Sequence, residues 1–328
     1  MKICVLGSGT WGSALANLLA SYGHNVYCWS KFKEEADYLN SSHVHKHLPN
    51  VTLSMNILFD SDMAKCVDGA EVVIFATPST FIRGTAEAFK PLYNGQLLVS
   101  VAKGIEKVTF KTMTEVIEDV LGIDNDVVAL TGPTHAEEVS IKLPTCIVAS
   151  SKNKNNALKV QHLFHSEYFR VYTNTDRKGS ELCGAFKNII AIACGISDGL
   201  GFGDNTKAAI ITRGVHELKN LGIKMGCREN TFSGLAGIGD LIVTCTSRHS
   251  RNNQAGHYIG EGYSVKDAID KVGMVVEGIA SLDAAVSLCK SHNIDMPIVF
   301  AVDSIVNHNV PAKEAALSIL TRNKKSEF

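Results

Sequence analysis

The stretch ICVLGSGTWGSALANLL, residues 3–19, decides the fold that this sequence predicts. An apolar run passes directly into glycines spaced G-x-G-x-x-G, and apolar residues at helical spacing follow. In such a unit Gly7 permits the tight turn, Gly9 lets the backbone approach a pyrophosphate, and Gly12 lets helix and strand pack closely. The start of the helix supplies free N–H groups and a partial positive charge for phosphates. The stretch therefore predicts a dinucleotide-binding βαβ unit.

The alternation of short β-branched runs with helical stretches continues through the first half of the chain. It predicts βαβ units and a parallel sheet, whereas the pattern from Gly179 onward is mostly helical. The polar segment TNTDRKG at 173–179 lies between the two patterns. We therefore expect an α/β, Rossmann-type doubly wound, mostly parallel sheet domain over residues 1–178 and an all-helical domain over residues 179–328. The expected strands are Ile3–Leu6, Asn25–Trp29, Glu71–Ala76, Gln96–Val101, Val127–Thr131, Thr145–Ala149 and Phe169–Tyr172. The expected helices include Trp11–Ser21, Thr112–Leu121 and Asn155–His165, then Glu181–Ser197, Asn205–Leu221, Ser250–Tyr258, Ser264–Ile269, Glu277–His292, Met296–Val306 and Ala312–Leu320.

The composition excludes several classes of protein. With 328 residues, 45% apolar and 20% charged, the chain can bury a large core, which excludes a disordered protein. Its 32 Lys and Arg against 33 Asp and Glu create no global field that attracts nucleic acid or anionic lipid, so an anionic ligand must be bound locally. The longest apolar run, eight residues at 189–196, is too short to span a bilayer.

The nine cysteines are dispersed and form no CxxC pair, which is typical of buried, reduced thiols in a cytosolic protein. The N-terminus enters a strand and a glycine turn at once, which leaves no room for a signal peptide. We expect a cytoplasmic protein, and the apolar helical half favours a homodimer.

The end of the second expected strand bears on the choice of cofactor. An Asp or Glu there would hold the ribose 2′-hydroxyl of NAD, but the sequence reads Trp-Ser-Lys-Phe-Lys at 29–33. Ser30 and Lys31 can hydrogen-bond and neutralise a 2′-phosphate, so the pattern favours NADP, with NAD use open. Alternatively, Lys31 and Lys33 are solvated surface charges.

The segment LCGAFKNIIAIACGIS at 182–197 is apolar on nearly every side and predicts a buried helix whose one charged residue is Lys187. Burial disfavours the charged form of a lysine, which suits a general acid and base for alcohol–ketone interconversion. The alternative is a lysine that extends its head to water. The adjacent Asn188 favours a shared polar cavity instead.

Two further segments contain candidate site residues. In FSGLAGIGDL at 232–241, Asp240 follows a glycine-rich turn and either pairs with a buried lysine or caps a short helix. In TSRHSRNN at 246–253, Ser250, Arg251 and Asn252 stand where we expect a helix to begin, with Arg248 nearby. Helix N–H groups and a forked guanidinium form a local phosphate site, unless the segment is an ordinary cap with solvated arginines.

Two weaker signals remain. Lys103 follows an expected parallel strand, at the edge where such sheets bind ligands. His43, His45 and His47 alternate in SSHVHKHLPN at 41–50, but their Ser, Asn and Pro neighbours indicate an exposed loop, so we predict no metal site there.

Together these motifs resemble the soluble, bacterial type of NAD(P)-dependent glycerol-3-phosphate dehydrogenase over nearly the whole chain. The matching stretches are GSGTWGSALA at 7–16, AKG at 102–104, TGPTHAEE at 131–138, LPT at 143–145, ELCGAFKNIIAIACGISDGLGFGDN at 181–205, ITRG at 211–214, GLAGIGDLIVTC at 234–245, SRN at 250–252, VVEG at 275–278 and MPI at 296–298. Several motifs in the right order are more specific than any one of them.

The resemblance implies reversible hydride transfer between NAD(P)H and dihydroxyacetone phosphate, which forms sn-glycerol 3-phosphate for glycerophospholipid synthesis. It implies that Lys187 accepts the proton in alcohol oxidation and donates it in ketone reduction, beside Asp240. The implied substrate residues are Lys103, Asn188 and Thr244, with Arg251 and Asn252 on the phosphate and Gly132, Thr134 and Ser250 near the ligands. The implied cofactor residues, beyond the three motif glycines, are Thr10, Trp11, Lys31, Lys103, Ala136, Arg251, Val275 and Glu277.

The chain departs from the family pattern at two positions. Many members have Ser where Thr10 stands, and Thr where Ala102 precedes Lys103. The second change removes a hydroxyl near the nicotinamide region.

Two alternatives stay open at this point. The chain could be a related two-domain dehydrogenase for another β-hydroxy or 2-oxo acid, or a nicotinamide-binding sensor without turnover. A substrate panel distinguishes the first alternative from a glycerol-3-phosphate dehydrogenase. The second is disfavoured if Lys187 is buried beside Asp240, because a sensor does not need such a pair.

Overall fold

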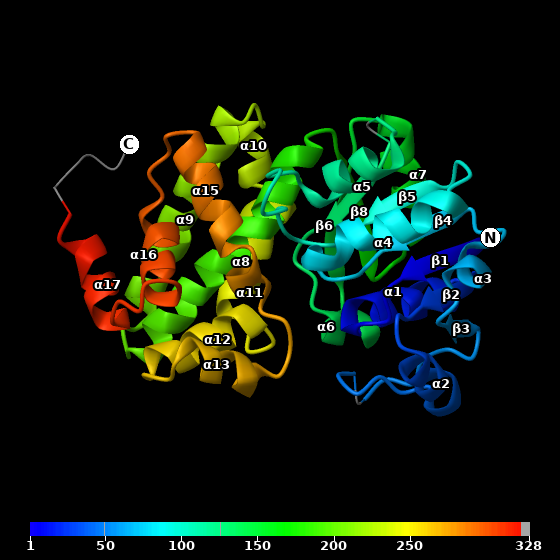
Figure 1. Ribbon diagram of the computed structural model, residues 1–328, viewed down its shortest axis with the longest axis horizontal. Coiled ribbons are helices and arrows are strands. Elements are labelled where there is room, and N and C mark those ends of the chain that lie inside the picture. The colour runs from blue at the N-terminus through cyan, green and yellow to red at the C-terminus, as the bar shows by residue number, and fades with distance from the viewer. Residues whose placement is uncertain (49, 125, 323–328) are drawn as a thin grey trace. The chain divides into compact units, whose positions relative to one another are not determined.

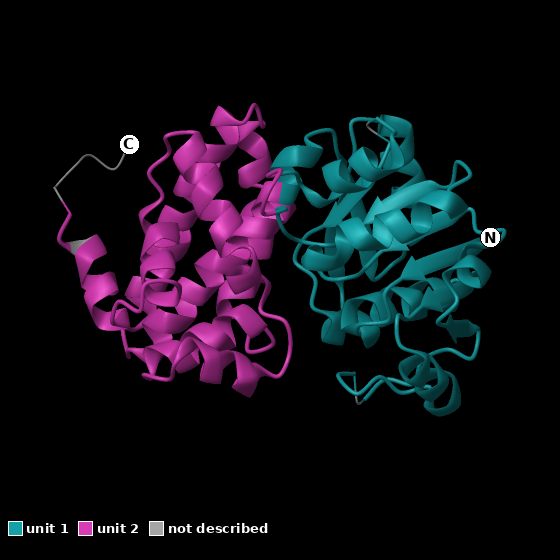
Figure 2. Ribbon diagram, viewed as in Figure 1, with its two compact units in different colours: residues 1–106, 111–181 teal, residues 107–110, 182–328 magenta. Residues whose placement is uncertain are grey.

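The computed structural model describes residues 1–48, 50–124 and 126–322. The chain forms two compact units (Figure 2). Unit 1 comprises residues 1–106 and 111–181, and unit 2 comprises residues 107–110 and the chain from Leu182 onward. Residues 323–328 of the expected helical domain lie outside the described residues.

Unit 1 is built on a sheet whose eight strands follow the order β3-β2-β1-β4-β5-β6-β7-β8 (Figure 1). All neighbouring strands are parallel except β6 and β7, so the expected doubly wound, mostly parallel sheet is confirmed. The short edge strand β3 was not predicted, because its apolar run covers only three residues, Ile57–Phe59. The strands are β1 (Lys2–Leu6), β2 (Asn25–Trp29), β3 (Ile57–Asp60), β4 (Val72–Phe75), β5 (Leu97–Ser100), β6 (Val128–Thr131), β7 (Thr145–Ser150) and β8 (Phe169–Asn174).

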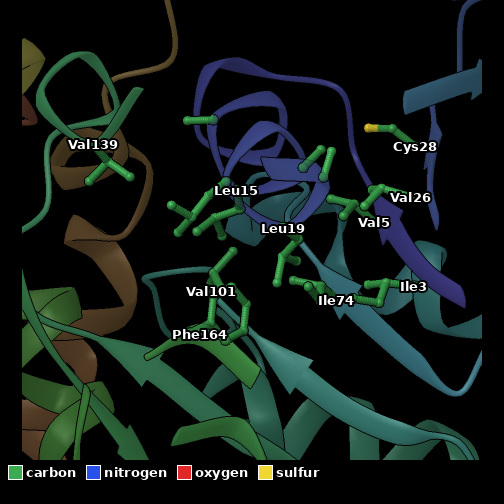
Figure 3. Packing of buried hydrophobic residues seen from close by; sticks show 14 of the residues in the cluster. Ile3, Val5, Leu15, Leu19, Val26, Cys28, Ile74, Val101, Val139 and Phe164 are labelled. Carbon is green, nitrogen blue, oxygen red and sulfur yellow. The ribbon is translucent and has the colours of Figure 1, made fainter. Parts of the chain in front are cut away.

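Helices pack against the sheet and bury it. Ile3 and Val5 of β1 join one buried cluster, while the alternating Cys4 and Leu6 join a second cluster. Successive side chains of a strand point to opposite faces, so β1 is buried on both sides, as its unbroken apolar run predicts. Figure 3 shows the first cluster, which contains Leu15 and Leu19 of α1 together with residues of the strands such as Val5 and Ile74. The helices are α1 (Thr10–Ser21), α2 (Lys33–Ser42), α3 (Met63–Val67), α4 (Ile82–Phe89), α5 (Met113–Leu121), α6 (Ala136–Ser140) and α7 (Lys154–Phe164), with two short 3-10 turns at Ser79–Phe81 and Lys90–Leu92.

The secondary-structure elements in the described residues of unit 2 are all helices, as expected. One expectation was wrong in detail, because the expected helix Glu277–His292 is interrupted at Ser281. A short helix begins at Asp240, where the sequence had left open a short helix capped by this residue. The elements are α8 (Arg177–Gly199), which starts in unit 1, then α9 (Asp204–Lys224), α10 (Glu229–Phe232), η3 (Leu235–Gly239), α11 (Asp240–Thr246), α12 (Arg251–Gly260), α13 (Val265–Val272), α14 (Glu277–Ala280), α15 (Leu282–Ser291), α16 (Pro297–Val306) and α17 (Ala312–Leu320).

Helix α8 is the core of unit 2. Within the described part of the chain it is the one helix long and apolar enough to cross a membrane, but 94% of its most apolar window is buried inside the protein. Helix α12 packs closely on α8, because a Cβ at Gly256 would lie 2.2 Å from the Ile192 carbonyl oxygen and one at Gly195 would lie 2.0 Å from the Asn253 carbonyl oxygen. These glycines fix the position of α12 against α8.

The histidine segment differs from the expected exposed loop. The side chain of His45 is 4% exposed, and its Nδ1 accepts the His47 N–H. A bridge between Val44 and Thr52 folds the segment back on itself, which buries the ring. Pro49 lies outside the described residues. All nine cysteines are free, and all except Cys146 are buried.

Candidate functional site

The glycine loop has the form that a phosphate requires. Gly7 has a φ of +125°, which favours glycine, and a Cβ at Gly12 would lie 2.0 Å from the Gly7 carbonyl oxygen. A Cβ at Gly9 would instead meet nothing within 4 Å. The loop is therefore fixed against the first helix on one side and open at Gly9, as the spacing predicts.

The first residues of α1 offer unpaired donors beside this open side. Gly9 is the N-cap of α1 and provides no side-chain cap. The Thr10 hydroxyl is buried and has no hydrogen-bond partner among the described residues. Trp11 is partly buried and packs against the core. The orphaned hydroxyl and the free helix N–H groups fit a dinucleotide pyrophosphate.

A carboxylate that the sequence analysis missed lies at the end of β2. Glu35, in the first turn of α2, accepts hydrogen bonds at Oε2 from Ser8 Oγ at 2.6 Å and from Ser30 Oγ at 2.5 Å. No residue of the strand end itself is acidic, so the motif gave no signal for Glu35. Glu34 and Glu35 both stand in the first turn of α2, so the sequence shows acids near the strand end but does not single out Glu35. Lys31 is exposed.

The remaining unit 1 candidates gather at the strand ends. Lys103 Nζ donates to the Gly132 carbonyl oxygen at 3.3 Å, and Thr134 Oγ1 donates to the same oxygen at 3.1 Å. Gly132 follows β6 directly with a φ of +157°. Ala136 is the first residue of α6 and is 8% exposed. The structure thus brings Lys103, Gly132 and Thr134 together.

Lys187 lies in a buried polar cluster of unit 2. Its side chain is 8% exposed, and that of Asp240 is 1% exposed. The Lys187 Nζ lies 2.5 Å from Asp240 Oδ1 and 2.7 Å from Thr244 Oγ1. Asp240 and Thr244 are one turn apart on α11, so they face the same side. The lysine does not extend to water, and the ion pair that the sequence left open is present.

The glycine-rich turn places Asp240. Within η3, Gly237 has non-helical backbone angles, and a Cβ there would lie 2.2 Å from the Phe232 carbonyl oxygen. Gly239 is the N-cap of α11, so Asp240 does not cap this helix, which was the alternative role that the sequence allowed. Its carboxylate is directed to Lys187 instead.

A neighbouring thiol adds no second anion. A hydrogen bond with Cys194 and burial raise the pKa of Cys245 well above its ordinary value, so this thiol stays neutral. The Lys187 charge is therefore matched by the Asp240 carboxylate.

Asn188 belongs to a second cluster. Its Oδ1 accepts from Asn252 Nδ2 at 3.0 Å, and Asn252 Oδ1 accepts the Gly278 N–H at 2.9 Å. A Cβ at Gly278 would lie 2.7 Å from the Asn188 carbonyl oxygen, so α14 approaches α8 closely here. This contact fixes the amide of Asn252, whose second N–H has no partner among the described residues.

The start of α12 has the expected helix-terminal arrangement. Ser250 is the N-cap and accepts the Asn253 N–H, and Arg251 is the first helical residue. The Arg251 side chain is partly exposed and has no ion pair in the part of the chain that the structure describes. Val275 is 42% exposed, and Glu277 begins α14 beside the Asn252 contact.

The candidates thus form several groups, which are divided between the two units. In unit 1 they are the glycine loop with Thr10, Trp11 and Lys31, and the group of Lys103, Gly132, Thr134 and Ala136. In unit 2 they are Lys187, Asp240 and Thr244, then Asn188 and Asn252, then Ser250, Arg251, Val275 and Glu277.

Known proteins share both halves of this arrangement. The family model for the NAD-dependent glycerol-3-phosphate dehydrogenase N-terminus matches residues 2–157, and the model for the C-terminus matches residues 176–317. Glycerol-3-phosphate dehydrogenase [NAD(P)+] 2 of Lactobacillus delbrueckii subsp. bulgaricus is 50% identical over 335 residues, covering 100% of this chain and 99% of that protein. The corresponding Fusobacterium nucleatum protein is 46% identical over 331 residues, again covering 100% and 99%.

A crystal structure gives the same result. Glycerol-3-phosphate dehydrogenase from Coxiella burnetii matches with a TM-score of 0.94 and 35% identity, covering 98% of this chain and 99% of that chain. This chain, with its glycine loop before α1 and its buried Lys187–Asp240 pair, belongs to the NAD-dependent glycerol-3-phosphate dehydrogenase family.

Proposed function

We propose that this chain catalyses the reversible reduction of dihydroxyacetone phosphate to sn-glycerol 3-phosphate with NADH or NADPH. The observation that carries the proposal is the buried ammonium of Lys187, held 2.5 Å from Asp240 in a helix whose next residue bonds to the start of α12. A nicotinamide sensor without turnover would not need this ion pair.

Lys187 is the proposed proton donor in ketone reduction and the acceptor in alcohol oxidation. When bound, the reduced nicotinamide supplies the hydride for the substrate C2. The carbonyl oxygen gains negative charge as the hydride arrives, and the Lys187 ammonium stabilises and protonates it. Asp240 and Thr244 hold the Nζ in place by their two short contacts.

The start of α12 is the proposed phosphate site. Arg251 supplies a guanidinium, and Asn252 supplies the amide N–H left after its bond to Asn188. Ser250 is near the same helix end, where N–H groups favour an anion. A phosphate fixed here holds the reacting carbon at a set distance from Lys187.

The remaining roles are proposals that rest on the resemblance. Residues 1–178 form the dinucleotide-binding domain, and residues 179–328 form the substrate domain. Lys103, Gly132 and Thr134 contact substrate, while Gly7, Gly9, Gly12, Thr10, Trp11, Lys31, Lys103, Ala136, Arg251, Val275 and Glu277 contact the dinucleotide.

The biological setting is proposed on the same ground. The product supplies glycerophospholipid synthesis, and the enzyme acts in the cytoplasm as a homodimer that neither inserts into a membrane nor binds nucleic acid. The near-neutral net charge of −1 supports the last point.

A substrate panel with two arginine variants tests the function. Wild-type protein is assayed with dihydroxyacetone phosphate, unphosphorylated dihydroxyacetone and a 2-oxo acid. We expect turnover of the phosphorylated ketone alone. Arg251→Ala raises KM for it by about tenfold or more because a charge-assisted contact is lost, while the exposed Arg248→Ala leaves KM unchanged. Preferential turnover of the 2-oxo acid would contradict the proposal.

A further inference from the structure

We propose that Glu35 sets the cofactor preference of this enzyme and favours NAD(H) over NADP(H). The inference rests on the proposed function only in that it requires a dinucleotide on the glycine loop. It reverses the preference that the strand-end sequence Trp-Ser-Lys favours.

The carboxylate of Glu35 lies where the adenosine ribose of a dinucleotide is recognised. In a βαβ dinucleotide unit, the ribose hydroxyls are held at the end of the second strand, beside the glycine loop. Ser30 is the residue after β2, and Ser8 is the second residue of the loop. Both hydroxyls donate to Oε2 of Glu35, at 2.5 and 2.6 Å. The acid comes from α2 rather than from the strand, yet it lies at the strand end.

The hydrogen bonds leave a free acceptor for a hydroxyl. Ser8 and Ser30 are 4% and 1% exposed, so their bonds to Oε2 are protected from water. Oε1 of Glu35 has no partner among the described residues. An ionised carboxylate only accepts, so Oε1 suits the 2′-hydroxyl of NAD, which can donate. A 2′-phosphate dianion cannot donate and is repelled by the same charge.

The same bonds remove a donor that a 2′-phosphate would need. The Ser30 hydroxyl already donates its hydrogen bond to the Glu35 carboxylate. Lys33 is paired with Asp37, with 2.7 Å between Nζ and Oδ2. Of the two expected partners of a 2′-phosphate, Ser30 and Lys31, the first is therefore already engaged by Glu35.

The other charged groups around Glu35 do not reverse this balance. Burial and the neighbouring His47 lower the pKa of His45, which lies beside Ser8 and Glu35, so its ring adds no cation at neutral pH. Lys31 is exposed, so its ammonium lies in water, where salt screens its charge. The carboxylate is fixed by two bonds, whereas Lys31 must be ordered at an entropic cost before it can contribute.

Dinucleotide affinity, measured without substrate, tests the proposal. Titration calorimetry gives Kd for NADH and NADPH with wild type, Glu35→Gln and the control Glu34→Gln, whose side chain is exposed. Glutamine keeps an acceptor for the two serines but removes the charge. We expect wild type to bind NADH at least about tenfold more tightly than NADPH, and Glu35→Gln to tighten NADPH by about tenfold, with Glu34→Gln unchanged. Raising the salt concentration should narrow the wild-type difference.

Three results would overturn the inference. They are tighter wild-type binding of NADPH, equal changes for both dinucleotides in Glu35→Gln, and a change as large in Glu34→Gln. If Glu35→Gln unfolds, Glu35→Asp is the second variant, because it keeps the charge and should retain the preference for NADH. These Kd measurements contain no substrate, so they test the role of Glu35 independently of the reaction. If the substrate panel shows no turnover of dihydroxyacetone phosphate, the proposed function is refuted, but the Kd ratios still show whether Glu35 sets the dinucleotide preference.

Discussion

Two variants of the Lys187–Asp240 pair distinguish its contribution to stability from its contribution to catalysis. Removing Lys187 alone leaves the Asp240 carboxylate, 1% exposed, without its cation. Breaking a buried pair in this way costs about 3 to 5 kcal/mol, which for a unit of this size lowers Tm by roughly 6 to 20 °C. Removing both charges is close to neutral. We therefore expect Lys187→Ala to melt early and the double variant Lys187→Met with Asp240→Asn to melt near wild type.

Neither variant should turn over. Loss of a general acid lowers kcat by about a hundredfold or more, whatever the stability. The assay combines thermal melts by circular dichroism, NADH binding by fluorescence and turnover of dihydroxyacetone phosphate. NADH binding should persist, since the glycine loop lies in unit 1. A double variant that regains kcat within about tenfold of wild type would refute the role of Lys187.

Two further predictions concern other parts of the chain. Gly12→Ala places a Cβ 2.0 Å from the Gly7 carbonyl oxygen, so dinucleotide affinity should fall by about tenfold or more in calorimetry, whereas Gly84→Ala in α4 meets nothing within 4 Å and should bind normally. Burial raises the pKa of Glu217 to about 8. A raised native pKa means that the stability from the protonated form is present at low pH and is lost as pH rises toward 8, so wild-type Tm should fall between about pH 5 and pH 8. Glu217→Gln should flatten this profile in thermal melts, and an unchanged slope would contradict the effect of burial.

Much of unit 1 could be predicted from the sequence, because its central strands β1, β4, β5 and β6 are buried on both faces and read as unbroken apolar runs. The expected helix Trp11–Ser21 differs from α1 by one residue. Strand β3 was missed because its apolar run, Ile57–Phe59, is only three residues long, too short to stand out as a strand.

The site was predictable where a polar residue breaks an apolar helix. Lys187 stands out in α8 because a buried charge needs a partner. The sequence named Asp240 as a candidate partner but left a helix cap as the alternative. The structure decides between them, because the turn at Gly237 precedes α11 and the Asp240 carboxylate contacts Lys187. Glu35 was missed for the opposite reason: it lies in a polar, exposed helix start, where nothing in the pattern distinguishes it from Glu34. Only the fold brings its carboxylate to Ser8 and Ser30.

The most direct test of the proposed reaction follows an isotope from cofactor to product. Wild-type protein is incubated with dihydroxyacetone phosphate and NADH that carries two deuterium atoms at C4 of the nicotinamide, and the product is analysed by mass spectrometry and NMR. We expect sn-glycerol 3-phosphate with deuterium at C2, in step with the loss of NADH absorbance. NADH and NADPH that bind but are not consumed, or a product without deuterium at C2, would contradict it.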